Sequence, residues 1–427
     1  MRILIASQFL PWPINTGGNS AVFSTLKCLE DDHQFTLVCP VYDEAGEADA
    51  TALQSQLPRV NLRAVFCGQA PRGKQKLSRR AAKWVVQHGR RLFPPPDPPA
   101  SRPRGRPGYP FSRLPEKIIV TLQEEISKGV DLCQAEFAAM LSLGAWFPKH
   151  IPKLFIHHQI HFIYSERCLE ISGRDAYSNY LDARWRVEEI AHLQQFDGVV
   201  TFSEQDRRAL LPWVTPEKVF VSPFPLPSDC ETALDLSGQF DGRFLFLASG
   251  EHDPNRDALE WFLAAIWPEM LRLLPSSRLV VIGKWDESFE AKHSSSRVAF
   301  AGFVEDLPAI LRGGIMLVPL RIGGGIRAKI IAAMAQGVPV VSTSVGCEGL
   351  LVKDGQDLLV RDDVPGFAAA AVQLAAEPQL WRRLATAGQA SVTQHYSPAG
   401  VRNRRNEIYA AITRATQNAP AVSESTA

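Results

Sequence analysis

Three consecutive glycines followed by two basic residues form the segment of this sequence that is best suited to chemistry. Gly323, Gly324 and Gly325 follow an apolar run of strand length and precede a helical pattern with Arg327 and Lys329 in its first turn. Glycines remove side chains where the start of a helix presents N–H groups without intrahelical acceptors, so an anion can bind there. Two cations in the first turn oppose the helix dipole, which favours a negative ligand such as pyrophosphate. The alternative is a flexible turn with two solvated charges.

A second turn of this kind lies upstream in the same half of the chain. Residues 249–257 (SGEHDPNRD) follow an apolar run and open a helical pattern, and we expect Asn255 to cap that helix. In open α/β sheets, ligands bind beyond the carboxyl ends of the strands. Two such turns in one domain favour a nucleotide diphosphate as the ligand, and we predict that Gly250, Glu251 and Asn255 line its site.

Candidate groups for acid–base chemistry lie in the first half of the chain. His157, His158 and His161 follow a predicted strand at the edge where a ligand would lie. Histidine exchanges a proton near neutral pH, and we favour His158 as the contact with an acceptor hydroxyl or a sugar. The alternative for the group is packed or solvated imidazoles. Weaker acceptor-side candidates are Gly17, Gly18, Asn19, Glu136 and His157. The residues interpreted as a solvated helix face are Arg184, Glu188 and Glu189.

These residues need a scaffold, and the apolar pattern predicts parallel sheets. Strand, loop, helix and strand follow one another over residues 2–38, which predicts parallel strands with a right-handed crossover. Similar alternation along the chain predicts a doubly wound α/β fold. The expected strands cover residues 2–7, 35–38, 62–66, 130–133, 153–157, 198–202, 219–222, 244–248, 278–282, 298–301, 315–319, 338–342 and 357–360. The expected helices of the second half cover residues 256–274, 307–312, 327–336 and 365 onward.

The same pattern divides the chain into two domains. A proline-containing, polar stretch at 223–242 reads as an interdomain connection. We expect a first Rossmann-like domain over residues 1–225 and a second over 226–395. A final helix over 396–416 is expected to pack back on the first domain, followed by a disordered tail at 417–427.

A basic, proline-rich segment at 71–117 interrupts the first domain. It contains thirteen Lys or Arg against two acidic residues, with ten prolines, so the rest of the chain has 33 basic and 43 acidic residues. Proline at this density opposes regular structure, and we expect a mobile loop. The functional interpretation is peripheral contact of residues 72–117 with anionic lipid headgroups at the inner membrane face. The alternative is a solvated excursion without a specific partner.

Bulk properties exclude several other classes of protein. The net charge of +1 gives no argument for nucleic acid, and no apolar run approaches the roughly 18 residues of a spanning helix. The apolar run at the N-terminus is too short for a signal peptide. Seven scattered cysteines without C-x-x-C spacing indicate reduced thiols, not a disulfide framework or a zinc site. We therefore expect a cytoplasmic protein.

Several ordered segments resemble one bacterial subgroup of the group 1 (family 4) retaining glycosyltransferases, which have the GT-B fold. Gly250, Glu251, Pro254, Asn255 and Asp257 resemble that subgroup's G-E-x-x-x-P-N-x-D, with one residue fewer before the proline. Residues 323–349 resemble G-x-G-x-R-x-K-I-x-E-A followed by G-x-P-x-V-S-T-x-x-G-x-E-G. In the first half, Gly17-Gly18 resembles the acceptor-side glycine loop. Residues 155–160 resemble the stretch H-H-E-I, and residues 197–204 resemble D-x-V-x-T-x-S-E.

The resemblance implies two Rossmann-like domains that face each other across a cleft. It implies transfer of a sugar from a nucleotide diphosphate to a glycan or lipid-linked acceptor, with retention and without a metal or other cofactor, as in polysaccharide biosynthesis. We see no D-x-D pair in either glycine-containing turn. The turn that ends in Val304 resembles the one near the donor base. The amides of 323–325, with Arg327 and Lys329, are expected to stabilise the leaving group.

The sequence departs from the family at the donor site. Two glutamates that much of the family carries fall here on Gly324 and Ala332, and Gln159 stands where the subgroup often has Glu. The resemblance implies that the second glutamate holds the ribose hydroxyls, which the Ala332 side chain cannot do. Glu348 is a candidate substitute on sequence proximity. The competing interpretations are a catalytically degenerate nucleotide- or glycan-binding protein and a sugar-nucleotide epimerase of the same fold.

Overall fold

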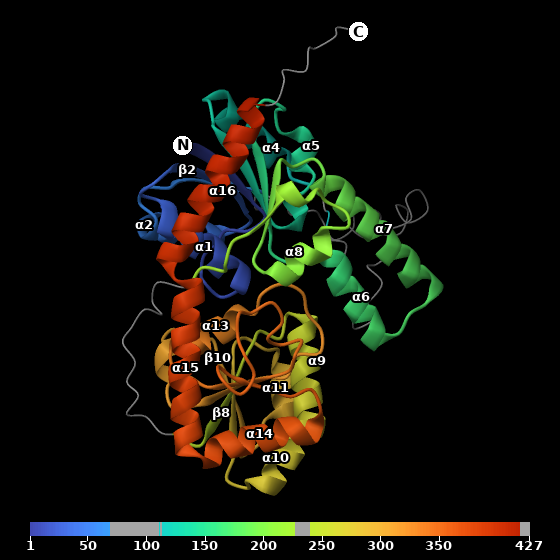
Figure 1. Ribbon diagram of the computed structural model, residues 1–427, viewed down its shortest axis with the longest axis vertical. Coiled ribbons are helices and arrows are strands. Elements are labelled where there is room, and N and C mark those ends of the chain that lie inside the picture. Colours follow the sequence, from blue (N-terminus) through green and yellow to red (C-terminus); the bar gives the residue numbers. More distant parts are fainter. Residues whose placement is uncertain (69–110, 112, 227–239, 419–427) are drawn as a thin grey trace, which may run out of the picture.

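Two α/β domains are stacked along the long axis of the molecule (Figure 1). The computed structural model describes residues 1–68, 111, 113–226 and 240–418. The first domain contains a seven-stranded sheet in the order β3-β2-β1-β4-β5-β6-β7, and the second a six-stranded sheet in the order β10-β9-β8-β11-β12-β13. All strand pairs within both sheets are parallel. The predicted fold class is therefore confirmed.

The strands are short and lie inside their domains. Those of the first sheet are β1 (Arg2–Ser7), β2 (Gln34–Val41), β3 (Asn61–Phe66), β4 (Leu132–Glu136), β5 (Lys153–His157), β6 (Gly198–Thr201) and β7 (Val219–Val221). Those of the second are β8 (Arg243–Leu247), β9 (Arg278–Ile282), β10 (Val298–Gly302), β11 (Ile315–Val318), β12 (Val340–Ser342) and β13 (Leu359–Val360). Strands such as β6 and β11 are buried throughout, because helices cover both faces of each sheet.

Helices connect these strands. Those of the first domain are α1 (Gly17–Leu29), α2 (Glu44–Gln56), α4 (Glu116–Ser127), α5 (Leu143–Trp146), α6 (His161–Ser172), α7 (Ala176–Leu193) and α8 (Glu204–Leu210), with 3-10 turns at Ala138–Met140 and Pro216–Lys218. Those that follow are α9 (Asp253–Trp261), α10 (Trp267–Leu273), α11 (Glu287–His293), α12 (Leu307–Leu311), α13 (Ala328–Ala335), α14 (Val364–Ala376), α15 (Pro378–Tyr396) and α16 (Pro398–Asn418). None of the described helices is long and apolar enough to cross a membrane.

Several predicted boundaries are wrong by a few residues. Gly17 to Asn19 form the first turn of α1 instead of a loop, and Glu136 is the last residue of β4 instead of lying beyond it. The helix expected over 256–274 is interrupted by a π turn at Phe262–Ile266. Pro268 follows that turn, and a proline lacks the N–H that regular helical bonding requires.

The basic segment lies almost entirely outside the described residues. Its predicted end at residue 117 is too late, since α4 already begins at Glu116. Lys117 donates to the backbone oxygen of Phe66, at 2.9 Å, and so ties the start of α4 to the end of β3. The membrane contact expected for 72–117 stays a prediction, as does the disorder of the tail, of which 419–427 are not described.

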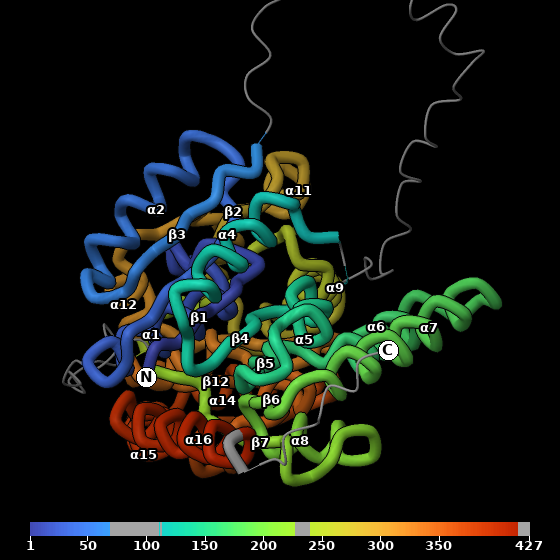
Figure 2. Tube along the Cα trace, turned by 90° about the horizontal axis from the view of Figure 1, so that it is seen from above, coloured from blue at the N-terminus to red at the C-terminus, as the bar shows by residue number. Residues whose placement is uncertain are grey.

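The last helix returns to the first domain. α15 packs on α13 and α14 of the second domain, whereas α16 packs on α1 of the first (Figures 1 and 2). Arg402 and Asn406 of α16 both donate to Asp32 at the end of α1. Tyr409 donates its hydroxyl to Gln134 Oε1, at 2.9 Å, inside the first domain. The first domain is therefore assembled from two distant parts of the chain.

Candidate active site between the two domains

The glycine triplet lies where the two domains meet. It follows β11 and precedes α13, at the carboxyl end of the second sheet, and it packs on the turn between β5 and α6 of the first domain. Gly325 has φ +73°, and a Cβ there would collide with the backbone oxygen of His158. A Cβ at Gly324 would lie 3.0 Å from Cγ of Gln159. Glycine is therefore needed here for the close approach of the domains.

Two guanidinium groups hold the carbonyl groups of this loop. Arg327 Nη1 donates to the oxygen of Gly324, at 2.9 Å, and to that of Gly325. Arg167 Nη1, from α6 of the first domain, donates to the oxygen of Gly323 at 2.5 Å. Among the described residues, no oxygen accepts a hydrogen bond from the backbone N–H groups of 323–326. The loop therefore offers unpaired amides, which is the property expected of an anion site.

Arg327 is more deeply placed than expected. It is the residue before α13, not a member of its first turn, and it is 8% exposed. Burial lowers its pKa to about 10, although the charge of Glu348 opposes that effect. Its guanidinium shapes the glycine loop directly, a role that the spacing of the residues did not indicate.

Lys329 joins the two turns of the second domain. Its Nζ donates to Oδ1 of Asn255, at 3.0 Å, and lies 5.8 Å from the centre of the Phe246 ring. Burial, with a smaller contribution from the charge of Arg327, lowers its pKa to about 7. In the part of the chain that the structure describes, no carboxylate lies within 4.0 Å of the charged atoms of Arg327 or Lys329.

The turn at 249–257 differs from the prediction at its cap. α9 begins at Asp253 after His252, so Asn255 is not the N-terminal cap. Asn255 instead donates through Nδ2 to the oxygen of Ser249, at 2.9 Å, and this bond orients its Oδ1 toward Lys329. A Cβ at Gly250 would lie 2.6 Å from the Trp285 ring.

The remaining donor-side candidates lie at the ends of neighbouring elements. Glu251 is exposed. Val304 is half-buried in the turn after β10, beside the exposed Phe303. Ala332 is half-buried on α13. Glu348, after β12, is bound by Arg167 through two hydrogen bonds of 2.5 and 2.6 Å.

A buried chain of hydrogen bonds leads to His158. Its Nε2 lies 2.6 Å from Oε2 of Glu136, and its ring stacks on Phe137 with 3.9 Å between the centroids. The other oxygen of Glu136 accepts from Gln134 Nε2, at 2.6 Å, and Gln134 is itself bound by Tyr409 of α16. The structure thus pairs two of the predicted acceptor-side residues, and a carboxylate holds the imidazole in one orientation.

His157 and Glu189 have a different place from the predicted one. Glu189 is fully buried, which contradicts its interpretation as part of a solvated face. Its oxygens accept from the N–H groups of His161 and Phe162, both at 3.0 Å, at the start of α6. His157 is buried and lies 3.0 Å from Oε1 of Glu189. Burial opposes ionisation of Glu189, but its partners outweigh it and lower the pKa. Arg184 and Glu188 form a partly exposed pair, as expected of a surface.

The start of α1 faces the start of α13. A Cβ at Gly17 would lie 3.3 Å from Cβ of Ala328, and a Cβ at Gly18 would lie 2.7 Å from the Phe137 ring. Asn19 donates through Nδ2 to the oxygen of Pro13, at 2.9 Å. The acceptor-side glycines and the donor-side glycines are therefore brought to one place.

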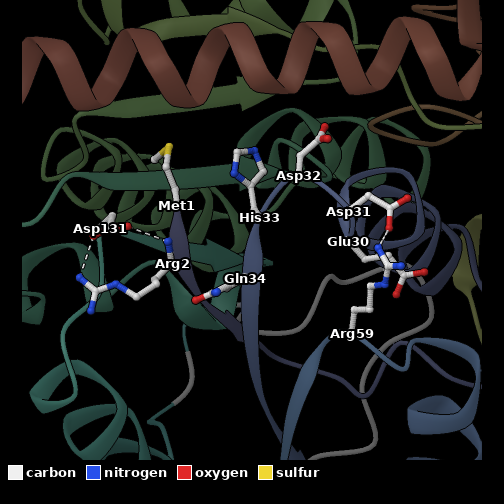
Figure 3. A pocket seen from close by; sticks show the side chains of 9 residues that line it. All are labelled: Met1, Arg2, Glu30, Asp31, Asp32, His33, Gln34, Arg59 and Asp131. Carbon is white, nitrogen blue, oxygen red and sulfur yellow. Dashed lines mark hydrogen bonds and ion pairs between the residues drawn. The ribbon is translucent and has the colours of Figure 1, made fainter.

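A hollow of about 510 Å³ lies elsewhere, at the amino ends of β1 and β2 (Figure 3). Its charged side chains pair with one another or with α16, as Arg2 with Asp131, Arg59 with Asp31, and Arg402 with Asp32. Ligands of open α/β sheets bind at the carboxyl ends of the strands, so we do not assign the active site to this hollow.

Comparison with known sequences finds a family match within the second domain. Residues 243–377 match the sequence profile of the family described as Glycosyl transferases group 1. The lipopolysaccharide core biosynthesis glycosyltransferase LpsE of Rhizobium meliloti is 33% identical over 105 residues, which are 24% of this chain and 31% of that protein. An uncharacterized 44.6 kDa protein of the cps region of Klebsiella pneumoniae is 27% identical over 124 residues, 27% of this chain and 32% of that one. The matches thus span about a third of these curated relatives.

Comparison with solved structures gives the fold of the whole chain. Anabaena Alr3699/HepE in complex with UDP is 14% identical, with a TM-score of 0.64 over 96% of this chain and 100% of that chain. TarM of S. aureus is 13% identical, with a TM-score of 0.66 over 96% of this chain and 98% of TarM. A sucrose-phosphate synthase from Thermosynechococcus elongatus is 16% identical, with a TM-score of 0.65 over 97% of this chain and 100% of the synthase. The expected two-domain GT-B architecture is confirmed.

Proposed function

We propose that this chain, whose residues 243–377 match the group 1 glycosyltransferase family, transfers a sugar from a nucleotide diphosphate to a glycan or lipid-linked acceptor, with retention at the anomeric carbon. LpsE is named for lipopolysaccharide core biosynthesis, and we extend surface-polysaccharide biosynthesis to this protein as part of the proposal. The HepE structures contain UDP or UDP-glucose, which makes uridine the first base to test.

One observation carries this proposal: among residues whose structure is described, the amides of the glycine loop have no acceptor and the two neighbouring cations have no carboxylate within 4.0 Å. Removing a positive charge from water is costly unless a counter-charge compensates it. A diphosphate would supply that counter-charge to Lys329, and its oxygens would accept hydrogen bonds from the N–H groups of the loop. Donors that are already oriented stabilise negative charge as it develops on a leaving group.

On the donor side, we assign different tasks to the two cations. Lys329, held by Asn255, contacts the diphosphate. Arg327 fixes the glycine loop through Gly324 and Gly325. Gly250, Glu251 and Val304, which follow β8 and β10, line the remainder of the donor pocket in this proposal.

On the acceptor side, we assign the polar contact to His158. Its carboxylate partner Glu136 favours an imidazole that is protonated at Nε2, since that nitrogen lies 2.6 Å from Oε2. Such a ring can hold a hydroxyl or the sugar in place, or exchange a proton with it. The turn at Gly17, Gly18 and Asn19 lies opposite α13 and completes this side.

A specific observation favours a second candidate, a catalytically degenerate binding protein. Ala332 offers no side-chain acceptor for a ribose, and Glu348, its expected substitute, is bound by Arg167. Under this alternative, the protein binds the nucleotide without turnover.

The test begins with a thermal-shift screen of nucleotide sugars and nucleoside diphosphates, because a ligand that binds the native state raises the melting temperature. Release of free nucleotide that depends on an added acceptor supports transfer, and binding without release supports the degenerate alternative. The absence of any shift, together with the absence of nucleotide release, would refute both.

A further inference from the structure

We propose that Arg167, on α6 of the first domain, is a positioning residue that completes the donor site of the second domain. The inference rests on the proposed function, because it assigns this arginine to the diphosphate site. α6 and α7 form a hairpin that extends from the body of the first domain (Figure 2). The base of α6 borders the second domain, and Arg167 reaches across that boundary.

Arg167 makes three hydrogen bonds to the second domain. Nη1 donates to the oxygen of Gly323 and to Oε2 of Glu348, both at 2.5 Å, and Nη2 donates to Oε1 of Glu348 at 2.6 Å. Both side chains are largely buried, with 23% of Arg167 and 19% of Glu348 exposed. A guanidinium that binds a carboxylate through two nitrogens is fixed in direction as well as in distance.

These bonds determine how the glycine loop presents its amides. In a trans peptide the carbonyl oxygen and the N–H of the next residue point in opposite directions. Arg167 holds the oxygen of Gly323, while Arg327 holds those of Gly324 and Gly325. The N–H groups of 324–326 therefore point away from the two guanidinium groups. One of the three bonds that set this arrangement comes from the other domain.

Glu348 has a second hydrogen-bonding partner in the first domain, in addition to Arg167. Gln205 of α8 donates through Nε2 to Oε1 of Glu348 at 2.5 Å. The bonds to Glu348 raise the pKa of Arg167, so its positive charge is secure at any physiological pH. The loop after β11 and the loop after β12 are thus fixed together only while the domains are in contact. A separated second domain would lack this arrangement, so closure of the two domains and binding of the diphosphate should favour each other.

The experiment measures the binding of UDP, GDP and ADP to the full chain by calorimetry, for the wild type and for Arg167→Ala, Arg167→Lys and Arg174→Ala. Arg174 is the matched control, because it lies just beyond α6 and contacts Asn179 at 3.3 Å and Glu166 at 3.8 Å, both near the surface. We expect Arg167→Ala to weaken binding of the preferred diphosphate by about tenfold or more. The affinity of Arg167→Lys should lie between those of the wild type and Arg167→Ala. An ammonium keeps the charge, but it is a point charge and cannot bind both oxygens of Glu348 as the two guanidinium nitrogens do. Arg174→Ala should bind as the wild type does.

Steady-state kinetics distinguish positioning from a general structural role. Arg167→Ala should raise KM for the donor more than KM for the acceptor, whereas a structural defect would affect both. If Arg167→Ala is unstable, Arg167→Lys gives the same comparison at nearly unchanged volume. Unchanged diphosphate binding in both variants would overturn the inference while leaving the proposed function intact. Failure of the wild type to bind any diphosphate would refute the proposed function itself.

Discussion

Lys329 is the residue whose charge the fold controls most directly. Its pKa is about 7, so the free protein loses this proton as the pH rises through neutrality. A bound diphosphate favours the charged form and raises the pKa again. At pH 8, binding should therefore be coupled to the uptake of a proton by Lys329.

Calorimetry in two buffers of different ionisation enthalpy measures this uptake at pH 8. The control is Lys329→Arg, because arginine stays charged at every pH of interest. Protons that the diphosphate itself takes up or releases contribute equally to both proteins and cancel in the comparison. We expect the wild type to take up a fraction of a proton more than this variant at pH 8, and the difference to vanish near pH 6. Equal uptake by both proteins at pH 8 would refute a neutral Lys329 in the free protein.

Arg327 should matter through the loop that it holds. Arg327→Ala leaves the oxygens of Gly324 and Gly325 without their donor, so the amides lose their fixed direction. We expect kcat/KM to fall by about 10²- to 10³-fold, the range observed when a preorganised donor is lost. Arg327→Lys should recover little, because one ammonium cannot follow the guanidinium geometry. Measured nucleotide release at wild-type rates in Arg327→Ala would show that the loop keeps its shape without this side chain.

At the level of single residues, sequence spacing indicates which residues are candidates for the site, but not which side chains contact one another. The sequence singles out the glycines, Arg327, Lys329 and His158 because they follow strands and precede helices, and their functional roles stay predictions. The pairing of Lys329 with Asn255 could not be found, since it joins positions 74 apart. Arg167 was missed altogether, because an arginine on a polar helix face gives no local signal. Glu348 was the one related signal, because a carboxylate near the donor site requires a partner. Its proximity to Ala332 in the sequence led us to expect the ribose as that partner instead of an arginine.

Helix α6 begins at a buried carboxylate, and this cap supports the turn that carries His158. Glu189→Gln removes the charge and places an NH₂ group against one of two backbone donors, His161 or Phe162. We expect a loss of about 1–3 kcal/mol in the free energy of unfolding, the usual result of an unsatisfied buried group. Urea denaturation at pH 7 measures it. Glu188→Gln, on the same helix but paired near the surface with Arg184, should change stability by less than about 0.5 kcal/mol.

The effect of this carboxylate depends on pH in a defined direction. The folded protein lowers the pKa of Glu189 below its ordinary 4.5, so the ionised form contributes stability above that pH. The contribution disappears as the pH falls through the folded value. The difference between wild type and Glu189→Gln should thus be largest near neutrality and shrink below about pH 4.5. A difference that grows in acid would contradict the assigned ionisation.

At the level of elements, apolar runs predicted the strands closely because both faces of each sheet are buried. β5 and β9 have the predicted bounds, Lys153–His157 and Arg278–Ile282. The errors fall where backbone geometry depends on tertiary contacts. The first turn of α1 is glycine-rich and forms beside Phe137, and the π turn of the second domain precedes Pro268. Local propensity does not report such contacts.

At the scale of the whole molecule, two glycines offer a comparison of domain contact with backbone strain. Gly325 and Gly355 both have positive φ, +73° and +72°, so the backbone conformation opposes alanine at either position. A Cβ at Gly325 would collide with His158 of the other domain, whereas nothing lies within 4 Å of a Cβ at Gly355. We expect Gly325→Ala to increase the radius of gyration in solution X-ray scattering and to weaken diphosphate binding. Gly355→Ala should do neither, and the same radius for both variants would contradict the close contact.

The return of α16 has a consequence for biosynthesis. Gln134 and Tyr409, which meet inside the first domain, are 275 positions apart, whereas residues 240–396 of the second domain are contiguous. On the ribosome, the half that is translated later can therefore finish folding first. The half that is translated earlier keeps the face of α1 that α16 will cover exposed until α16 is made, and such exposed surface makes a partly folded chain prone to aggregation.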